Sequence, residues 1–251
     1  MLFLDRAIKS SLHKPPTSEL AALTTEWGER LDAEHPLAEH PKPQMQRERW
    51  ISLNGVWDYA FVACDDPAAA WRDDCGPEEY DGSIVVPFSP EAPLSSVGKR
   101  PPADALLIES RDIRLPALGP GECAILHFEA VDWACSVWLN GKKACEHMGG
   151  YTPFSCDITP FLEDGPNRLS LSIYDPSEKG AQLRGKQRID RGTMWYTAQS
   201  GIWQSVWCEI VPEQHIERLE IAPDADAALL KVRAAVSEGD APLEVEVLDG
   251  G

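Results

Sequence analysis

Short apolar segments separated by turn residues recur along the chain from Trp50 onward. The segment "RLSLSIYD" alternates strictly, with Leu169, Leu171 and Ile173 on one side and serines on the other. This is the pattern of a strand that has one buried face. The spacing of the segments is typical of all-β sandwiches. The sequence therefore predicts an all-β fold.

Two segments add detail to this prediction. "SVWLNGKKACEH" places Asn140-Gly141 between two alternating runs, and both residues tolerate the positive φ of a type I′ hairpin turn. "SGIWQSVWCEIVP" is apolar at both parities, so we expect its strand to be covered on both faces. Some other part of the chain should therefore pack outside that strand.

The two ends of the chain differ from its middle. The first 45 residues are rich in Pro, Glu and His, with at most one weak helix, and are typical of an arm or a leader. After Pro212, "HIERLEIAP", "ALLKVRAAV" and "LEVEVLDGG" predict three short strands, which would leave edges unpaired in a domain of their own. We therefore interpret the chain as a piece of a longer one. Three regions are expected: an arm (1–45), a sandwich (46–212) and the first strands of a second β domain (213–251).

The charge of the chain limits its partners. A formal net charge of -18 repels phosphate backbones and anionic lipid, so we expect no nucleic acid or membrane partner. Asp5 and Arg6 interrupt the early apolar patch, which excludes a signal-peptide core, and no stretch approaches the roughly 20 apolar residues of a membrane span. We expect a cytoplasmic protein.

The cysteines and histidines suggest neither a disulfide framework nor a metal site. Seven cysteines is an odd number, and no CxxC pair is present. Cys123, Cys135, Cys145 and Cys156 fall about one per predicted strand, which could bring some together, but small apolar core residues are the favoured interpretation. Six scattered histidines form no HExxH motif. We expect no metal and no cofactor.

One long loop carries the candidate binding residues. "RGKQRIDR" has four basic residues and a single acid in an acidic chain, and "GTMWYTAQSGIW" follows it directly. Aromatic faces that stack on sugar rings and forked donors that hold hydroxyls or carboxylates are typical of a binding rim, although a solvated basic loop remains an alternative. No nucleophile elbow, Walker loop or dinucleotide fingerprint is present, so no catalytic residue is assigned. The candidate substrate-binding residues are Arg184, Lys186, Gln187, Asp190, Trp195 and Tyr196.

Several stretches, in order, carry a family resemblance. They are "PLAEHPKPQMQRERWISLNGVWDYAF", "VPFSPEAPLSSVG", "VDWACSVWLNGKKACEHMGGYTPFSCDITPFLEDGPNRLSLSIYDPSE", and "RGKQ" followed by "MWYTAQSGIWQSVWCEIVP". Over residues 36–212 the chain resembles the amino-terminal part of glycoside hydrolase family 2, the β-galactosidase, β-glucuronidase and β-mannosidase group. The resemblance implies a jelly-roll sugar-binding sandwich, then an immunoglobulin-like sandwich, here incomplete, then a (β/α)8 barrel with two catalytic glutamates.

The resemblance also implies that this chain alone is inactive. The barrel is absent, and the family's acid/base glutamate follows an asparagine, whereas none of Asn54, Asn140 and Asn167 is followed by Glu. The module would therefore contribute to a retaining β-glycosidase, with carbohydrate as substrate and the chain's own downstream barrel as partner. A free-standing lectin-like module and a structural module for homo-oligomer contacts are the alternatives.

In the family, the loop before a Gly-Ile dipeptide reaches over the barrel mouth and carries an acid that touches the sugar. The dipeptide matches Gly201-Ile202, and Asp190 is the nearest acid. A ligand-facing Arg184, Lys186 or Arg188 would favour an anionic sugar such as a uronate.

The chain departs from the family at one strand. Relatives usually read Leu-Trp-Tyr-Arg-Arg where this chain reads "LIESR", from Leu107 to Arg111, so an aromatic pair is lost and Glu109 is gained. The change should alter packing or a rim contact, and it prevents the transfer of a particular sugar specificity. Large aromatics mostly serve burial, so the following are assigned to core and interdomain packing: Trp50, Trp57, Trp133, Trp138, Trp203 and Trp207.

Overall fold

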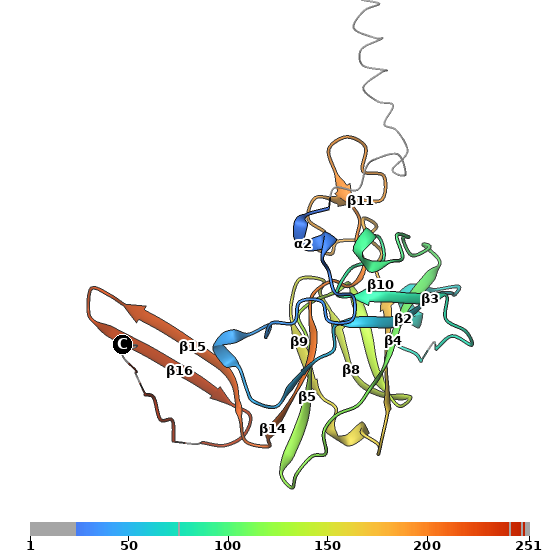
Figure 1. Cartoon of the computed structure of the whole chain (residues 1–251). Coiled ribbons are helices and arrows are strands. Elements are labelled where there is room, and N and C mark those ends of the chain that lie inside the picture. Colours follow the sequence, from blue (N-terminus) through green and yellow to red (C-terminus); the bar gives the residue numbers. More distant parts are fainter. Residues whose placement is uncertain (1–23, 75, 241, 247, 249–251) are drawn as a thin grey trace, which may run out of the picture.

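A computed structural model describes residues 24–74, 76–240, 242–246 and 248 as a two-layer β-sandwich with an attached hairpin (Figure 1). One sheet has six strands in the order β3 (Gly82–Val86), β2 (Gly55–Ala63), β4 (Ala105–Ile113), β10 (Asn167–Tyr174), β7 (Ala134–Leu139) and β8 (Lys142–Met148). The other has four, in the order β1 (Trp50–Ser52), β14 (Val206–Pro212), β5 (Glu122–Phe128) and β9 (Phe154–Asp157). Neighbouring strands in both sheets are antiparallel, which confirms the predicted jelly-roll class.

Shorter elements complete the described part of the chain. The helical turns are α2 (Glu26–Glu29), η2 (Pro43–Met45), α3 (Pro67–Ala70), η3 (Pro93–Ser95) and η4 (Thr159–Phe161). The short strands are β6 (Val131–Asp132), which pairs with β13 (Gly201–Ile202), and β11 (Gln187–Arg188), which pairs in parallel with β12 (Tyr196–Thr197). The hairpin is β15 (Ile216–Asp224) and β16 (Leu229–Val236). None of the described helices has the length and apolar character needed to cross a membrane.

The main core lies between the two sheets. On β10 the predicted alternation is confirmed, since Leu169, Leu171 and Ile173 are buried in that core. A second cluster, which contains Trp71 and Ile108, packs on the outer face of the six-stranded sheet. Strand β4 therefore contributes apolar side chains to both clusters, and its first six residues are all buried.

Strand β14 is covered on both faces, as expected. Cys208 faces the core between the sheets, while Trp207 faces outward and is also buried. The ring of His40 packs edge-on against Trp207 with 5.0 Å between centroids, and Arg47 Nε donates to Glu209 Oε2 over 2.8 Å. The cover is therefore supplied by the segment that precedes β1.

The predicted turn between β7 and β8 is confirmed. Asn140 and Gly141 have φ of 52° and 72°, as a type I′ turn requires. The side-chain amide of Asn140 also donates, through Nδ2, to Oδ1 of the buried Asn167 over 2.8 Å. The turn is thereby fixed to the start of β10.

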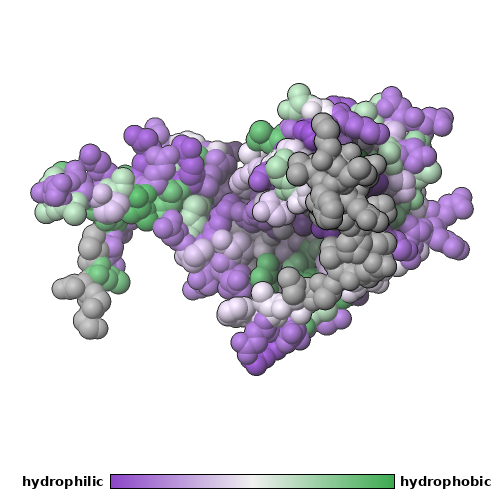
Figure 2. Space-filling view, turned by 90° about the horizontal axis from the view of Figure 1, so that it is seen from above, coloured by the Kyte–Doolittle hydropathy of each residue, from purple (hydrophilic) through white to green (hydrophobic). Residues whose placement is uncertain are grey.

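The hairpin β15–β16 projects from the sandwich and exposes apolar side chains on the left of the view from above (Figure 2). Ile221 is 47% exposed and Leu229 is 56% exposed. The third strand expected from "LEVEVLDGG" is not formed at residues 242–246, where no backbone ladder joins them to a described strand, and the rest of that segment includes residues outside the described part. The assignment of 213–251 to a second domain stays a prediction.

The hydrogen bonds of Asn167 yield a stability prediction. Its Oδ1 accepts from Glu163 N and Asn140 Nδ2, and its Nδ2 donates to Glu163 O and Gly165 O, all between 2.7 and 3.1 Å. Asn167→Ala should lower the free energy of unfolding in urea by about 2 to 4 kcal/mol, because it strands buried polar groups. Glu163→Ala removes only an exposed side chain at the same turn and should cost less than about 1 kcal/mol. Equal losses in the two variants would contradict this account.

Candidate functional site

The loop of residues 176–200 connects β10 to β13 and stands at one end of the sandwich, around the label β11 in Figure 1. Gln187 pairs with Tyr196, and Arg188 pairs with Thr197. Gln187 Oε1 also accepts from Gln199 N over 3.0 Å. The loop therefore has a folded frame of its own.

Three of the six predicted binding residues belong to this frame. Arg184 Nη1 donates to the carbonyl of Glu178 over 3.0 Å, and Gln187 makes the bonds just described. Trp195 is half-buried, with the guanidinium of Arg188 4.5 Å from its ring centre. These side chains are occupied in holding the loop together.

The other three predicted residues face solvent. Tyr196 is 67% exposed, and its N–H donates to the carbonyl of Lys186 over 2.8 Å, so these two lie side by side. The exposed side chain of Lys186 has no partner among the described residues. Asp190 is exposed, and within the described residues its carboxylate accepts only from Gly192 N, over 3.4 Å. Their contact with a sugar stays a prediction.

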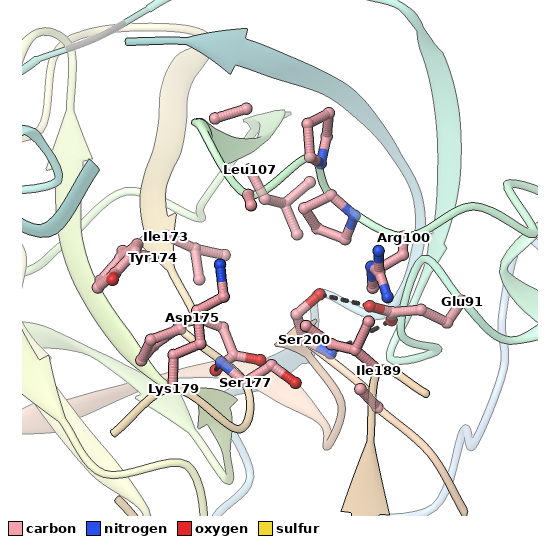
Figure 3. A pocket seen from close by; sticks show the side chains of 16 residues that line it. Glu91, Arg100, Leu107, Ile173, Tyr174, Asp175, Ser177, Lys179, Ile189 and Ser200 are labelled. Carbon is pink, nitrogen blue, oxygen red and sulfur yellow. Dashed lines mark hydrogen bonds between the residues drawn. The ribbon is translucent and has the colours of Figure 1, made fainter. Parts of the chain in front are cut away.

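A small cavity lies at the base of the loop. Its volume is about 70 Å³, and its lining includes Glu91, Asp175 and Ser200 (Figure 3). The carboxylate of Glu91 accepts from the Ser200 hydroxyl over 2.8 Å and from the Ser200 N–H over 3.2 Å. Glu91 therefore fixes the point at which the loop returns to the sandwich.

Glu109, the acid gained relative to the family pattern, lies beneath the same point. It has no exposed surface, its Oε2 accepts from Ile202 N over 3.2 Å, and its Oε1 has no partner among the described residues. Burial raises its pKa to about 8. The substitution noted in the sequence thus changes packing under the loop and adds no rim contact.

Asp132 and Asp175 complete a group of four acids around the loop base, of which Glu109 and Asp132 are buried and Glu91 and Asp175 are half-buried. Asp132 pairs through its backbone with Gly201, and its carboxyl lies against Gly150, where a Cβ would collide with it. Burial, followed by the nearby charge of Asp175 and then Glu91, raises the pKa of Asp132 to about 8. Burial likewise raises the pKa of Glu91 to about 7 and that of Asp175 to about 6.

Sequence reasoning missed this group because its members come from four distant segments. No periodicity marks them, although the unusual acid in "LIESR" was a usable signal for Glu109. Carboxyl groups of this kind accept hydrogen bonds from amides and hydroxyls. Across the residues that the structure describes, no cluster of three or more His, Cys, Asp or Glu could hold a metal ion.

An aromatic pair borders the acids. The rings of Tyr151 and Trp203 meet edge-on with 5.6 Å between centroids, and Trp203 Nε1 donates to the carbonyl of Gly150 over 2.7 Å. Tyr151 is 40% exposed. Trp203 thus packs locally, as the sequence suggested for the large aromatics.

Comparison with known proteins identifies the sandwich. Residues 104–212 match the family model described as "Glycosyl hydrolases family 2, sugar binding domain". Residues 104–212 of this chain are thus similar to the amino-terminal sugar-binding domain of glycoside hydrolase family 2. The resemblance inferred from the sequence is thereby confirmed.

Curated relatives are longer than this chain. It is 32% identical over 128 residues to a putative beta-glucuronidase of Formosa agariphila, covering 48% of this chain and 14% of that protein. It is 31% identical over 106 residues to a beta-galactosidase of Thermoanaerobacter pseudethanolicus, covering 41% of this chain and 14% of that protein. A match to a beta-galactosidase of Yersinia pestis has 26% identity and covers 82% of this chain and 20% of the relative. The chain thus spans between 14% and 20% of the length of these relatives.

Solved structures support the fold. The beta-glucuronidase of Faecalibacterium prausnitzii has a TM-score of 0.56 at 21% identity, with 77% of this chain and 37% of that chain covered. The enzyme of Ruminococcus gnavus in complex with D-glucuronic acid has a TM-score of 0.58 at 18% identity, with 78% of this chain and 36% of that chain covered. These similarities establish the shared architecture alone.

The buried acids yield a prediction on pH. Because the pKa of Glu109 is raised from 4.5 to about 8 in the folded protein, the native state binds more protons than the unfolded state between these values. The free energy of unfolding should therefore fall as pH rises through that window, by a few kcal/mol for this group alone. Glu109→Gln keeps an acceptor for Ile202 N, so the variant should be more stable than the parent at pH 9 and have a shallower pH profile. Urea unfolding at several pH values measures this.

The comparison between parent and variant isolates Glu109 from other titrating groups. Burial lowers the pKa of His40, which contributes with the opposite sign in the same range but is present in both proteins. Parallel pH profiles of the two proteins would contradict the assignment.

Gly201 yields a second prediction at this site. Its φ is +79°, and a Cβ there would lie 2.8 Å from Leu107 Cδ2 and 3.1 Å from Glu109 Oε1. Gly201→Ala should lower the free energy of unfolding by about 2 to 4 kcal/mol, through backbone strain and crowding. Gly141→Ala is the matched control, since Gly141 also has positive φ but no atom within 4 Å of the added carbon, and should cost about 1 kcal/mol. A loss at Gly201 no larger than that at Gly141 would show that the space beneath the loop is not filled as described.

Proposed function

We propose that this chain is the amino-terminal, non-catalytic sugar-binding module of a retaining β-glycosidase that hydrolyses O-glycosidic bonds. In this role the loop 176–200 forms part of the substrate rim of a (β/α)8 barrel. One observation carries the proposal: the sandwich fixes the loop at its base through Glu91 and Glu109, while Lys186 and Tyr196 remain free for a ligand. Loops positioned by a rigid scaffold commonly carry binding residues.

The loop also bears on the class of sugar. Of the three basic residues considered for an anionic ligand, Arg184 is bonded to the Glu178 carbonyl and Arg188 is 3.8 Å from the Glu178 carboxylate. Lys186 is the one of the three whose side chain has no such partner in the described structure. We propose that Lys186 favours a uronate or another anionic sugar, which is in keeping with the beta-glucuronidases among the relatives.

The size of the cavity at the loop base favours this role over that of a lectin site enclosed by the same loop. Ligand pockets usually have volumes of about 300 to 1,000 Å³, whereas the cavity at the loop base has about 70 Å³. It is too small to enclose a sugar ring. The candidate residues Lys186, Asp190 and Tyr196 lie on an open surface, where a second wall would be needed to exclude water.

Kinetics of the complete polypeptide that carries this domain test the proposal. Lys186→Ala and Tyr196→Ala should each lower kcat/KM by about tenfold, which corresponds to about 1.4 kcal/mol of lost binding in the transition state. Lys231→Ala is the matched control, because Lys231 is an exposed lysine on the hairpin, and its kinetics should not change. Unchanged kinetics in the two loop variants would overturn the proposed rim.

Calorimetric titration of the present chain separates the two functions. The rim proposal predicts millimolar binding or none for galactose, glucuronate and mannose, because the chain supplies only one side of the site. Micromolar binding of any of them would favour the lectin alternative. A stop codon directly after Gly251, with no barrel encoded downstream, would also contradict the leading proposal.

Two further points remain proposals. We propose a cytoplasmic location, which rests on the free thiols found in the described part of the chain. A role in homo-oligomer contacts would rest on the exposed apolar residues of the hairpin, among them Ile221 and Leu229.

A further inference from the structure

The sandwich has an open side where the edge strands of its two sheets meet. Strand β8 is the last strand of the six-stranded sheet, and β9 is the last strand of the four-stranded sheet. The chain passes directly from one to the other through the turn at residues 149–153. The two edges are joined here by a turn and by side chains, without a shared backbone ladder.

Side chains of these two strands meet in successive layers. Nearest the turn, the ring of His147 stacks on Phe154 with 4.2 Å between centroids and 13° between planes. Two residues further along each strand, on the same side, are Cys145 and Cys156. Cys145 pairs with the buried Val137 on β7, so both cysteines point toward the core.

Cys156 has the matching environment on the other sheet. It pairs with the buried Leu126 on β5 and packs against the same inter-sheet core as Cys145. The two thiols lie close enough to affect each other's ionisation: the Cys156 thiol lowers the pKa of Cys145, and the Cys145 thiol raises that of Cys156. Both residues are half-buried, whereas the neighbouring Cys135 is fully buried, so a small reagent reaches the pair more readily than it reaches Cys135.

We propose that Cys145 and Cys156 form a reversible disulfide that closes the open edge of the sandwich under oxidising conditions. The oxidant is a small-molecule disulfide such as glutathione disulfide. In the first step the Cys145 thiolate attacks one sulfur of the oxidant, which forms a mixed disulfide and releases one thiolate. In the second step Cys156 loses its proton and attacks Cys145 Sγ, and the second glutathione leaves as a thiolate that takes up a proton. Two protein thiols are oxidised and one disulfide is reduced to two thiols.

The order of the two steps follows from the charges. Cys145 attacks first because its thiolate is stabilised by the Cys156 S–H. The pKa of Cys156 is raised chiefly by the Cys145 thiol and further by burial. Once Cys145 is in a mixed disulfide it carries no charge, so the larger cause disappears and Cys156 ionises more readily than before, although burial still raises its pKa.

The bond would link the two sheets through a short loop. The closed segment runs from Cys145 to Cys156 and contains the turn between the edge strands. Closing such a loop restricts the unfolded chain and should raise Tm by about 5 to 10 °C for a domain of this size. This inference is independent of the proposed role in glycoside hydrolysis.

The test uses the purified chain, first fully reduced and then incubated with glutathione disulfide. Thiol titration after denaturation should show that two of the seven thiols are lost, and proteolytic mapping should find one peptide pair that joins Cys145 to Cys156. Tm should rise, and dithiothreitol should reverse both changes. Cys156→Ser should lose only one thiol, to a stable mixed disulfide between Cys145 and glutathione. Cys64→Ser, which replaces a half-buried cysteine in the second cluster, is the control and should still lose two thiols.

Several results would overturn the proposal. They are an unchanged thiol count in the folded parent chain, a glutathione that stays on Cys145 of the parent, or a bond that joins either cysteine to Cys135. Mapping is done on the unsubstituted chain, so the result does not depend on whether a variant folds.

Discussion

The placement of the candidate site depends on two carboxyl groups that hold one short backbone segment from both sides. Glu91 accepts from the amide and hydroxyl of Ser200, and Glu109 accepts from the amide of Ile202. Gly201 lies between them in a conformation with positive φ and with no room for a side chain. Because the loop 176–200 ends at this segment, the direction in which the loop leaves the sandwich is set here. The positions of the exposed rim side chains, such as Lys186 and Tyr196, depend on that direction.

This arrangement has an electrostatic cost. Glu109 and Asp132 are buried and Glu91 beside them is half-buried, and removal from water raises the pKa of each into the range from about 7 to about 8. A buried carboxyl without a cation is more stable in its neutral form. Near neutral pH these carboxyl groups therefore keep protons that solvent-exposed carboxyl groups would have lost. The domain gives up some stability to fix the base of a loop, as is common at sites that bind ligands.

Much of the fold could be predicted from the sequence because it depends on local patterns. The alternation in β10, the turn at Asn140-Gly141 and the double cover of β14 each follow from residue types at fixed spacings. The site could be predicted only in part. Composition marked the loop, yet it could not show that Arg184 is occupied with a carbonyl inside the loop.

The rest of the site was out of reach for a physical reason. The cluster of four acids forms only when four segments that are distant in the chain pack together. No local pattern in those segments indicates that their acids will meet. The departure at Glu109 was visible, but a single sequence could not decide between the rim and the core for that side chain. The third strand expected after β16 depends on a neighbouring strand, which local propensity does not supply.

Amide hydrogen exchange of the folded chain measures the stability of the loop base residue by residue, and so tests whether Glu91 and Glu109 hold the loop in place. We expect the amides of Ser200 and Ile202 to exchange as slowly as those of β10, and amides near the tip, around Asp190, to exchange fast. Exchange at Ser200 and Ile202 that is as fast as at the tip would show that the two carboxyl groups do not hold the loop, and would contradict the account.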